Sequence, residues 1–192
     1  MDREMLEPER GFVRLWTIQS HDAWENFNKT GALRADGRRV QRHDLDSYRW
    51  MMEQMQRRLP VYRGRFPVWA WYKPKPDLRG TGFLPPGVKG FRIEFVVPAA
   101  RVLLSDFNSW HHVLNGWYLP LTRDEAEEWF RLDNTSFNQA VTRKRLLDSW
   151  ERIFDLTLLH RSELTAPVTN VQGVLEEVYL REVEHADIFV SR

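Results

Sequence analysis

The hydrophobic positions of the chain change their period from segment to segment, and each period predicts a different element. Residues 13–18 form a short apolar run between polar neighbours, which is typical of a strand. In residues 20–30, Trp24 and Phe27 lie three apart on one helical face, after a serine that suits an N-cap. Gly31 then supplies the expected stop. The sequence therefore predicts a strand, a capped helix and a glycine stop.

The middle of the chain predicts a second helix followed by two strands. Residues 44–59 carry apolar side chains at helical spacing, and Pro60 ends the pattern. Residues 66–72 are apolar at odd and even positions, which predicts a strand buried on both faces. In residues 91–97 apolar side chains alternate with Arg92 and Glu94, which is typical of a strand with these two residues on its solvated face. Helices and strands thus already alternate in this half.

The second half predicts more helices and ends in strands. A short strand is expected over residues 101–104, helices after residues 106 and 122 and over roughly 137–153, and closing strands at 171–180 and 187–190. We therefore predict an α+β fold, with a mixed and mostly antiparallel sheet and helices inserted between the strands. One domain over residues 1–192 is expected, with a weakly ordered N-terminus at residues 1–10.

Composition narrows the class of protein. The chain has 192 residues, of which 42% are hydrophobic, and it contains no cysteine. The missing thiols exclude disulfide frameworks, thiolate zinc sites and cysteine nucleophiles. The acidic N-terminus has no apolar signal segment, and no run reaches the length of a membrane span. We therefore expect a cytoplasmic protein with no membrane partner.

Positive charge is concentrated in one third of the chain. Residues 31–65 contain several arginines and no lysine, whereas the C-terminal third is acidic. Guanidinium groups match the oxygens of a phosphate in pairs, so this composition suits a phosphate-bearing partner. The alternative interpretation is a solvated helix face with its flanking loops. The candidate residues for a non-catalytic nucleotide-phosphate or nucleic-acid binding module are Arg34, Arg38, Arg39, Arg42, Arg57 and Arg58.

Aromatic residues suggest a second kind of site. Nine tryptophans are present, and this large side chain with its polar N–H is seldom wholly buried. Trp69, Trp71 and Tyr72 are the best candidates for stacking on a base or nicotinamide ring. They could equally serve packing, or line an aromatic cleft for a protein partner.

Several common catalytic signatures are missing. The sequence has no Gly-x-Ser-x-Gly elbow, no phosphate-binding P-loop and no Gly-x-Gly-x-x-Gly motif. His111 and His112 are adjacent, and adjacent helical residues point about 100° apart, so they do not converge easily on one ion. We predict no metal site.

Glu176 and Glu177 fall within the predicted strand at 171–180, where adjacent side chains face opposite ways. One of the two must therefore point toward the core or a cleft, and Glu177 shares its parity with Leu175 and Tyr179. A carboxylate among apolar neighbours has a shifted pKa or is held ionised, which suits catalysis. The alternative is a salt bridge to an arginine of a neighbouring strand.

Four stretches together resemble an uncharacterised bacterial family, domain of unknown function 3841. They are Arg14-Leu15-Trp16-Thr17-Ile18-Gln19, Tyr48-Arg49-Trp50-Met51-Met52-Glu53-Gln54-Met55, Pro67-Val68-Trp69-Ala70-Trp71-Tyr72, and Leu103-Leu104-Ser105-Asp106-Phe107 with Trp110-His111. The layout of an early strand, a capped helix and a late strand with Glu177 is also similar to ADP-ribosyltransferase-like folds.

The similarity to ADP-ribosyltransferases implies NAD as a cofactor and a protein or nucleic acid as the target. It places Glu177 where a catalytic carboxylate stabilises the ribose cation, Trp71 or Tyr72 against the nicotinamide, and Arg14 at the dinucleotide. The family's usual spacing before Gly31 instead reaches Thr17, which has the opposite strand parity to Arg14. Leu175 also stands where an acidic or glutamine partner of the glutamate is usual.

Overall fold

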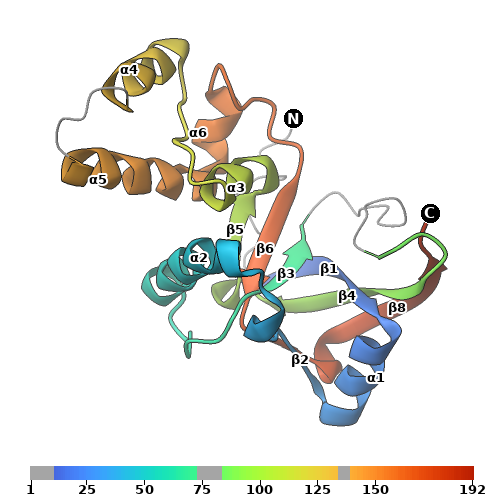
Figure 1. The fold of residues 1–192 in the computed structure, drawn as a ribbon. Helices are drawn as coiled ribbons and strands as arrows, with labels where there is room; N and C mark the ends of the chain where they lie inside the picture. The colour runs from blue at the N-terminus through green and yellow to red at the C-terminus, as the bar shows by residue number, and fades with distance from the viewer. Residues whose placement is uncertain (1–10, 73–83, 134–138) are drawn as a thin grey trace. The chain divides into compact units, whose positions relative to one another are not determined.

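Strand β1 (Phe12–Ser20) lies inside a sheet that, within the described residues, has six strands (Figure 1). The strand order is β5-β6-β3-β1-β4-β8, with β3 (Val68–Trp71) and β4 (Lys89–Pro98) on either side of β1. The outer strands are β5 (Leu103–Asp106), β6 (Val171–Leu175) and β8 (Val183–Val190). The pairs β1–β3, β1–β4, β3–β6 and β4–β8 are antiparallel.

The computed structural model describes residues 11–72, 84–133 and 139–192. It divides into unit 1, residues 1–104 and 172–192, and unit 2, residues 105–171. The α+β class with a mostly antiparallel sheet is confirmed. The prediction of one domain is not decided by this division, and the predicted weak order of residues 1–10 lies outside the described residues.

Helix α1 (His21–Thr30) follows β1 as the sequence predicts. The Ser20 side chain accepts a hydrogen bond from the backbone N–H of Ala23 at 3.3 Å, which caps the first turn. Gly31 adopts the left-handed conformation with φ of 73°, and its N–H reaches the Phe27 carbonyl at 2.8 Å. The cap and the stop predicted for this helix are therefore confirmed.

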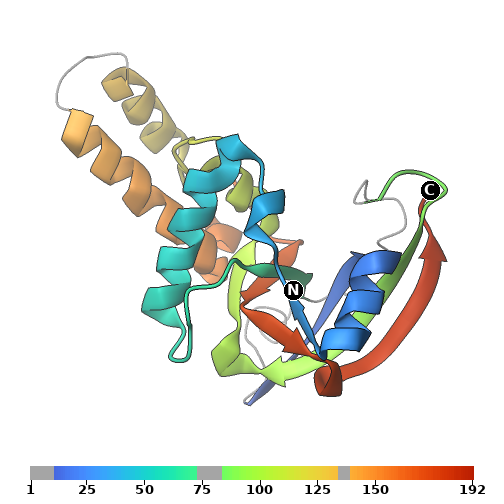
Figure 2. The ribbon, with the colours of Figure 1, turned by 60° about the horizontal axis from the view of Figure 1, so that its bottom comes forward.

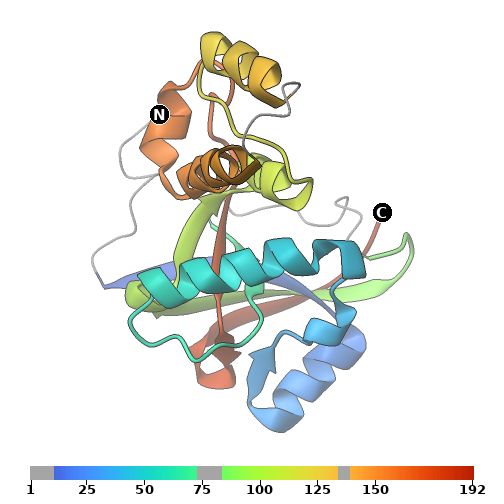
Figure 3. The ribbon, with the colours of Figure 1, turned by 60° about the vertical axis from the view of Figure 1, so that its left-hand side comes forward.

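Helices α1 and α2 (Leu45–Arg58) cover opposite faces of the unit 1 sheet (Figures 2 and 3). On one face, Trp24 of α1 stacks on Phe91 of β4 with ring centroids 5.1 Å apart. On the other face, Tyr48 of α2 meets Trp69 of β3 edge-on at 6.0 Å. In β3 itself, Tyr48 covers the face of Trp69, while Val68 and Ala70 on the other face are buried, which agrees with the apolar odd and even positions of the segment.

Two short strands and four 3₁₀ turns are the remaining elements in the described part of unit 1. Strand β2 (Ala32–Arg34) pairs with β7 (Glu177–Tyr179) in a separate two-stranded sheet. The remaining elements are single 3₁₀ turns, η2 (Gly37–Arg39), η3 (Arg42–Asp44), η5 (Ala99–Arg101) and η7 (Leu180–Glu182).

The predicted continuous strand over residues 171–180 is wrong. The chain bends at Glu176, so β6 belongs to the six-stranded sheet and β7 to the two-stranded one. Both halves are rich in β-forming residues, and the local pattern therefore does not show the break. The parity argument that linked Glu177 to Leu175 fails with it.

Unit 2 is mainly helical. Its elements are α3 (Phe107–Leu114), α4 (Arg123–Asp133), α5 (Gln139–Trp150), the 3₁₀ turn η6 (Glu151–Phe154) and α6 (Leu156–Arg161). The Asp106 side chain caps α3 by accepting from the Ser109 N–H at 2.7 Å, as predicted. In the described segments of both units, no helix combines the length and apolar composition needed to cross a membrane.

Candidate functional site

Glu177 lies where the two-stranded sheet joins distant parts of the chain. The antiparallel register sets Arg34 directly opposite Glu177, next to the buried pair Leu33 and Val178. Arg34 Nε donates to Glu177 Oε2 at 2.8 Å. Directly opposite charges stabilise a strand pair, so this salt bridge closes the end of the small sheet.

Arg65 approaches the same carboxylate oxygen from a loop. Its Nη1 donates to Glu177 Oε2 at 2.9 Å. Glu176 Oε1 accepts the backbone N–H groups of Arg63 at 2.8 Å and Arg65 at 3.0 Å, and the Tyr62 hydroxyl donates to the Arg65 carbonyl at 2.7 Å. Glu176 therefore fastens the arginine-bearing loop to the bend that separates β6 from β7.

Tyr179 occupies the second oxygen of Glu177. Its hydroxyl donates to Glu177 Oε1. The Arg181 guanidinium lies over the Tyr179 ring, with its Cζ 4.4 Å from the ring centroid. Arg101 lies 5.3 Å from the same ring, donates from Nη2 to the Glu177 carbonyl at 2.8 Å, and forms an ion pair with Glu182. Both carboxylate oxygens and the backbone carbonyl of Glu177 thus have partners.

Four guanidinium groups make the contacts just described with Glu177 and Tyr179, and a fifth arginine, Arg63, belongs to the loop bound by Glu176. We call these five residues the arginine cluster. The cluster consists of Arg34, Arg63, Arg65, Arg101 and Arg181. All five belong to unit 1.

Glu177 is held ionised beneath exposed arginines. Burial would raise the pKa of the Glu177 carboxyl, but hydrogen bonds from Tyr179 and Arg34 and the charges of Arg34 and Arg65 lower it below its ordinary value. The hydrogen bond to Glu177 raises the pKa of Tyr179. The Glu177 side chain is only 8% exposed, whereas those of Arg34 and Arg65 are 45% and 42% exposed.

The structure places Arg14 and Thr17 on opposite faces of β1, in agreement with their parity. Arg14 forms ion pairs with Glu94 and Glu184 on the neighbouring strands. Thr17 is buried, and its hydroxyl donates to the Trp69 carbonyl at 3.0 Å. Neither residue is a hydrogen-bond or ion-pair partner of Glu177 in the described part of the chain, so the roles given to them stay predictions.

Trp71 and Tyr72 lie on or just after β3. Trp71 is half-buried opposite Trp16 of β1, and Tyr72 is almost wholly buried. Among the described residues, neither side chain is a hydrogen-bond partner of Glu177. Stacking of these rings on a nicotinamide also stays a prediction.

Arg38, Arg39 and Arg42 are exposed on the two 3₁₀ turns that precede α2. The Arg38 guanidinium forms two hydrogen bonds with Asp36, at 2.9 and 3.0 Å, and this contact lowers the pKa of the Asp36 carboxyl. Part of the predicted basic surface is therefore neutralised locally. The phosphate-binding role of these three residues is an untested prediction.

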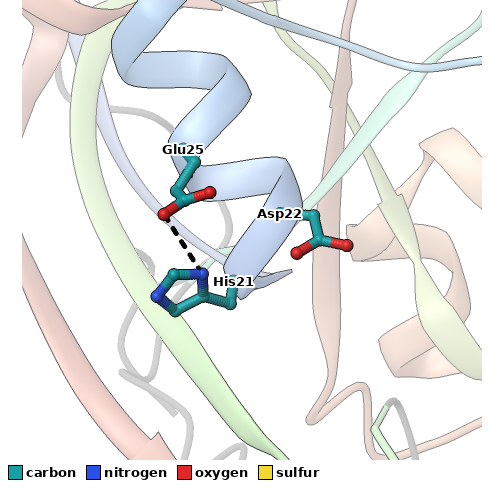
Figure 4. A group of neighbouring side chains, drawn as sticks. All are labelled: His21, Asp22 and Glu25. Carbon is teal, nitrogen blue, oxygen red and sulfur yellow. Dashed lines mark ion pairs between the residues drawn. The ribbon is translucent and has the colours of Figure 1, made fainter.

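One group of potential metal ligands occurs among the described residues, at the start of α1 (Figure 4). Its members are His21, Asp22 and Glu25, whose ligand atoms lie within 4.8 Å of one another. All three are exposed, and His21 Nδ1 already lies 3.6 Å from Glu25 Oε1. Such a helical ion pair forms readily in water without a metal, so the group gives no reason to assign one.

Sequence reasoning identified Glu177 but missed most of its partners. Arg34 and Arg65 fall within the predicted basic segment at 31–65, and an ion pair between Glu177 and a neighbouring strand was one of the two interpretations offered. Arg101 and Arg181 had no local signal, because each is a single arginine in a mixed segment. The pairing of β2 with β7 brings Arg34 to the Glu177 carboxylate, and the loop bound by Glu176 brings Arg65 to it.

Comparisons with known proteins identify a family. The model of the family described as "Domain of unknown function (DUF3841)" matches residues 14–183. No curated protein and no solved structure matches the chain. The similarity to ADP-ribosyltransferases therefore has no support from these comparisons.

Proposed function

The chain belongs to the DUF3841 family, whose description assigns no activity, and we propose that unit 1 binds a phosphate-bearing ligand such as a nucleotide at the arginine cluster. One observation carries the proposal. Arg34 and Arg65 both donate to a single oxygen of the buried Glu177, yet nearly half of each side chain remains exposed. A guanidinium has five N–H donors, and each of these two uses only one on Glu177.

Glu177 orders the side chains of Arg34 and Arg65 before a ligand binds. An ordered guanidinium loses less side-chain entropy on binding than a free one, which favours affinity. The ionised carboxylate beneath Arg34 and Arg65 supplies this order, while the loop fastened by Glu176 fixes the backbone of Arg65. Arginine also suits the role, because its planar fork matches two phosphate oxygens at once.

Calorimetric titration with inorganic phosphate, AMP and NAD tests the proposal. We expect binding of at least one of these probes, and a loss of tenfold or more in affinity in Arg34→Ala and Arg65→Ala. Arg49→Ala is the matched control, because Arg49 is an exposed arginine that pairs with Asp46 on α2. Circular dichroism confirms that the variants remain folded. No binding of any probe at millimolar concentration, or an equal loss in Arg49→Ala, would refute the proposal.

A second candidate is transfer of ADP-ribose from NAD, with Glu177 as the catalytic carboxylate. Its support is the ionised state of Glu177, since a carboxylate stabilises the positive ribose that forms when the bond to nicotinamide breaks and nicotinamide leaves with the electron pair. It ranks second because both oxygens of Glu177 already have partners, and Arg14 is engaged by Glu94 and Glu184. Nicotinamide release from NAD tests it, and unchanged turnover in Glu177→Gln would contradict it.

Nucleic acid is a further source of phosphate, and the exposed Arg38, Arg39 and Arg42 favour it. Binding to a phosphate backbone weakens steeply with salt because counterions are released. If the affinity for a short single-stranded RNA is the same at low and at physiological salt, nucleic acid is excluded as the ligand. Binding of a small phosphate-bearing ligand would then remain as the proposal.

A further inference from the structure

We infer that the group recognised by the arginine cluster is a dianionic phosphate monoester, such as the terminal phosphate of a mononucleotide, rather than the phosphodiester of a nucleic acid. The inference rests on the proposed function and specifies the ligand of the same site. Three properties of the cluster support it: the balance of its charges, the positive potential that remains above Glu177, and the number of elements that supply its arginines.

The charge balance favours a dianion. The contacts of the cluster involve five arginines and the carboxylates of Glu176, Glu177 and Glu182, which leaves two positive charges in excess. A phosphate monoester carries a charge of about −1.5 to −2 at neutral pH, whereas each diester carries one. A monoester therefore compensates the excess, and a diester leaves part of it.

A positive potential remains above Glu177. Its ionised carboxylate lies beneath Arg34 and Arg65 and offsets part of their charge, but not all of it. The remaining attraction scales with the charge of the ligand, so a dianion gains about twice as much as a monoanion in the same position. A monoester also offers three terminal oxygens as acceptors, where a diester offers two.

The arrangement of the arginines suits a compact end group. Arg34 comes from β2, Arg63 and Arg65 from the loop fastened by Glu176, and Arg181 from the turn after β7. These elements meet around one glutamate–tyrosine pair. A polymer backbone is instead followed by basic groups repeated along a groove.

The experiment compares monoesters with diesters of the same skeleton. Methyl phosphate is titrated against dimethyl phosphate, and AMP against 3′,5′-cyclic AMP, by calorimetry at pH 7.5 and low salt. We expect the monoester of each pair to bind at least tenfold more tightly. In Arg63→Ala and Arg181→Ala we expect the ratio of monoester affinity to diester affinity to fall, because removing a positive charge weakens the binding of a dianion more than that of a monoanion. Arg49→Ala, which removes an exposed arginine outside the cluster, is the control and leaves this affinity ratio unchanged.

The outcomes separate the inference from the proposed function. Equal affinity within both pairs, or tighter binding of the diesters, overturns the monoester inference while phosphate binding itself stands. A preference that stays constant in Arg63→Ala and Arg181→Ala also overturns it, since the cluster would then not be the cause. Absence of binding for all four ligands removes both the inference and the proposed function.

Discussion

Arg34 and Glu177 stand directly opposite each other on antiparallel strands, 143 residues apart in sequence, with Arg34 Nε 2.8 Å from Glu177 Oε2. The pair joins β2, which follows the first helix, to β7, the short strand between β6 and β8. Because the carboxylate is buried and the guanidinium is not, the pair orders a positive surface at the end of the small sheet.

The ionised state of Glu177 predicts a loss of stability in acid. A carboxyl whose folded pKa is lowered contributes stability that is fully present above its ordinary value of 4.5 and is lost as pH falls through the lower folded value. We therefore expect Glu177→Gln to lower the free energy of unfolding by about 1–3 kcal/mol at pH 7, and the difference from wild type to shrink as the pH falls below 4.5.

Urea unfolding at a series of pH values measures the effect of Glu177→Gln. Asp46→Asn is the control, because Asp46 pairs with Arg49 on an almost fully exposed surface and should change stability by only a few tenths of a kcal/mol. A Glu177→Gln difference that stays constant or grows toward pH 3 would contradict the role given to this carboxylate.

The left-handed conformation of Gly31 predicts that Gly31→Ala destabilises unit 1 by about 1–2 kcal/mol. A Cβ at this position would meet no atom within 4 Å, so the cost arises from the backbone conformation with φ of 73°. Gly31→Asn should lower the free energy of unfolding less than Gly31→Ala does, because asparagine tolerates this conformation better than alanine. Thermal or urea unfolding checks the expected order of stability, in which the glycine protein is the most stable, the asparagine variant intermediate and the alanine variant the least stable. Equal stability of the alanine and asparagine variants would argue against a backbone cause.

Close packing at Gly173 of β6 predicts that Gly173→Ala is also unfavourable, for a different reason. A Cβ there would lie 2.9 Å from Val102 Cγ1 and 3.2 Å from Leu15 Cδ2. Overpacking of this kind costs about 1–3 kcal/mol. Combining Gly173→Ala with Val102→Ala removes the nearest methyl groups, so the double variant should be more stable than the sum of the single effects predicts. Strict additivity in urea unfolding would show that the two sites do not touch.

In unit 2, Glu125 is the centre of a partly buried network. Its Oε1 accepts from Arg152 Nη2 at 2.6 Å and from the Tyr118 hydroxyl at 2.5 Å, and its Oε2 accepts from the Leu121 N–H at 2.8 Å. Glu125→Gln weakens these charge-assisted bonds, and we expect a loss of about 1.5–3 kcal/mol in the free energy of unfolding.

Glu128→Gln serves as the matched control for Glu125→Gln. Glu128 lies on the same helix, but its ion pair with Arg145 at 3.0 Å is more exposed and should contribute less than about 1 kcal/mol. Comparison of the two variants in urea separates the network from the general loss of an acid on α4. The interpretation fails if Glu128→Gln costs as much as Glu125→Gln.

The sequence by itself determined the local elements wherever one short segment held the whole signal. The Ser20 cap, the Gly31 stop and the strand β4 with Arg92 and Glu94 on one face were predicted because each depends on neighbours within a few residues. The opposite directions of Arg14 and Thr17 followed from strand parity alone. The α+β class followed from the order of these elements.

Only the tertiary structure decided the bend at Glu176 and the partners of Glu177. Residues 171–180 read as one strand because both halves favour β structure, whereas the break is fixed by Glu176 binding the N–H groups of Arg63 and Arg65. The arginine cluster likewise depends on pairing of β2 with β7. Contacts between residues more than a hundred positions apart are set by packing of the whole unit, and no local pattern records them.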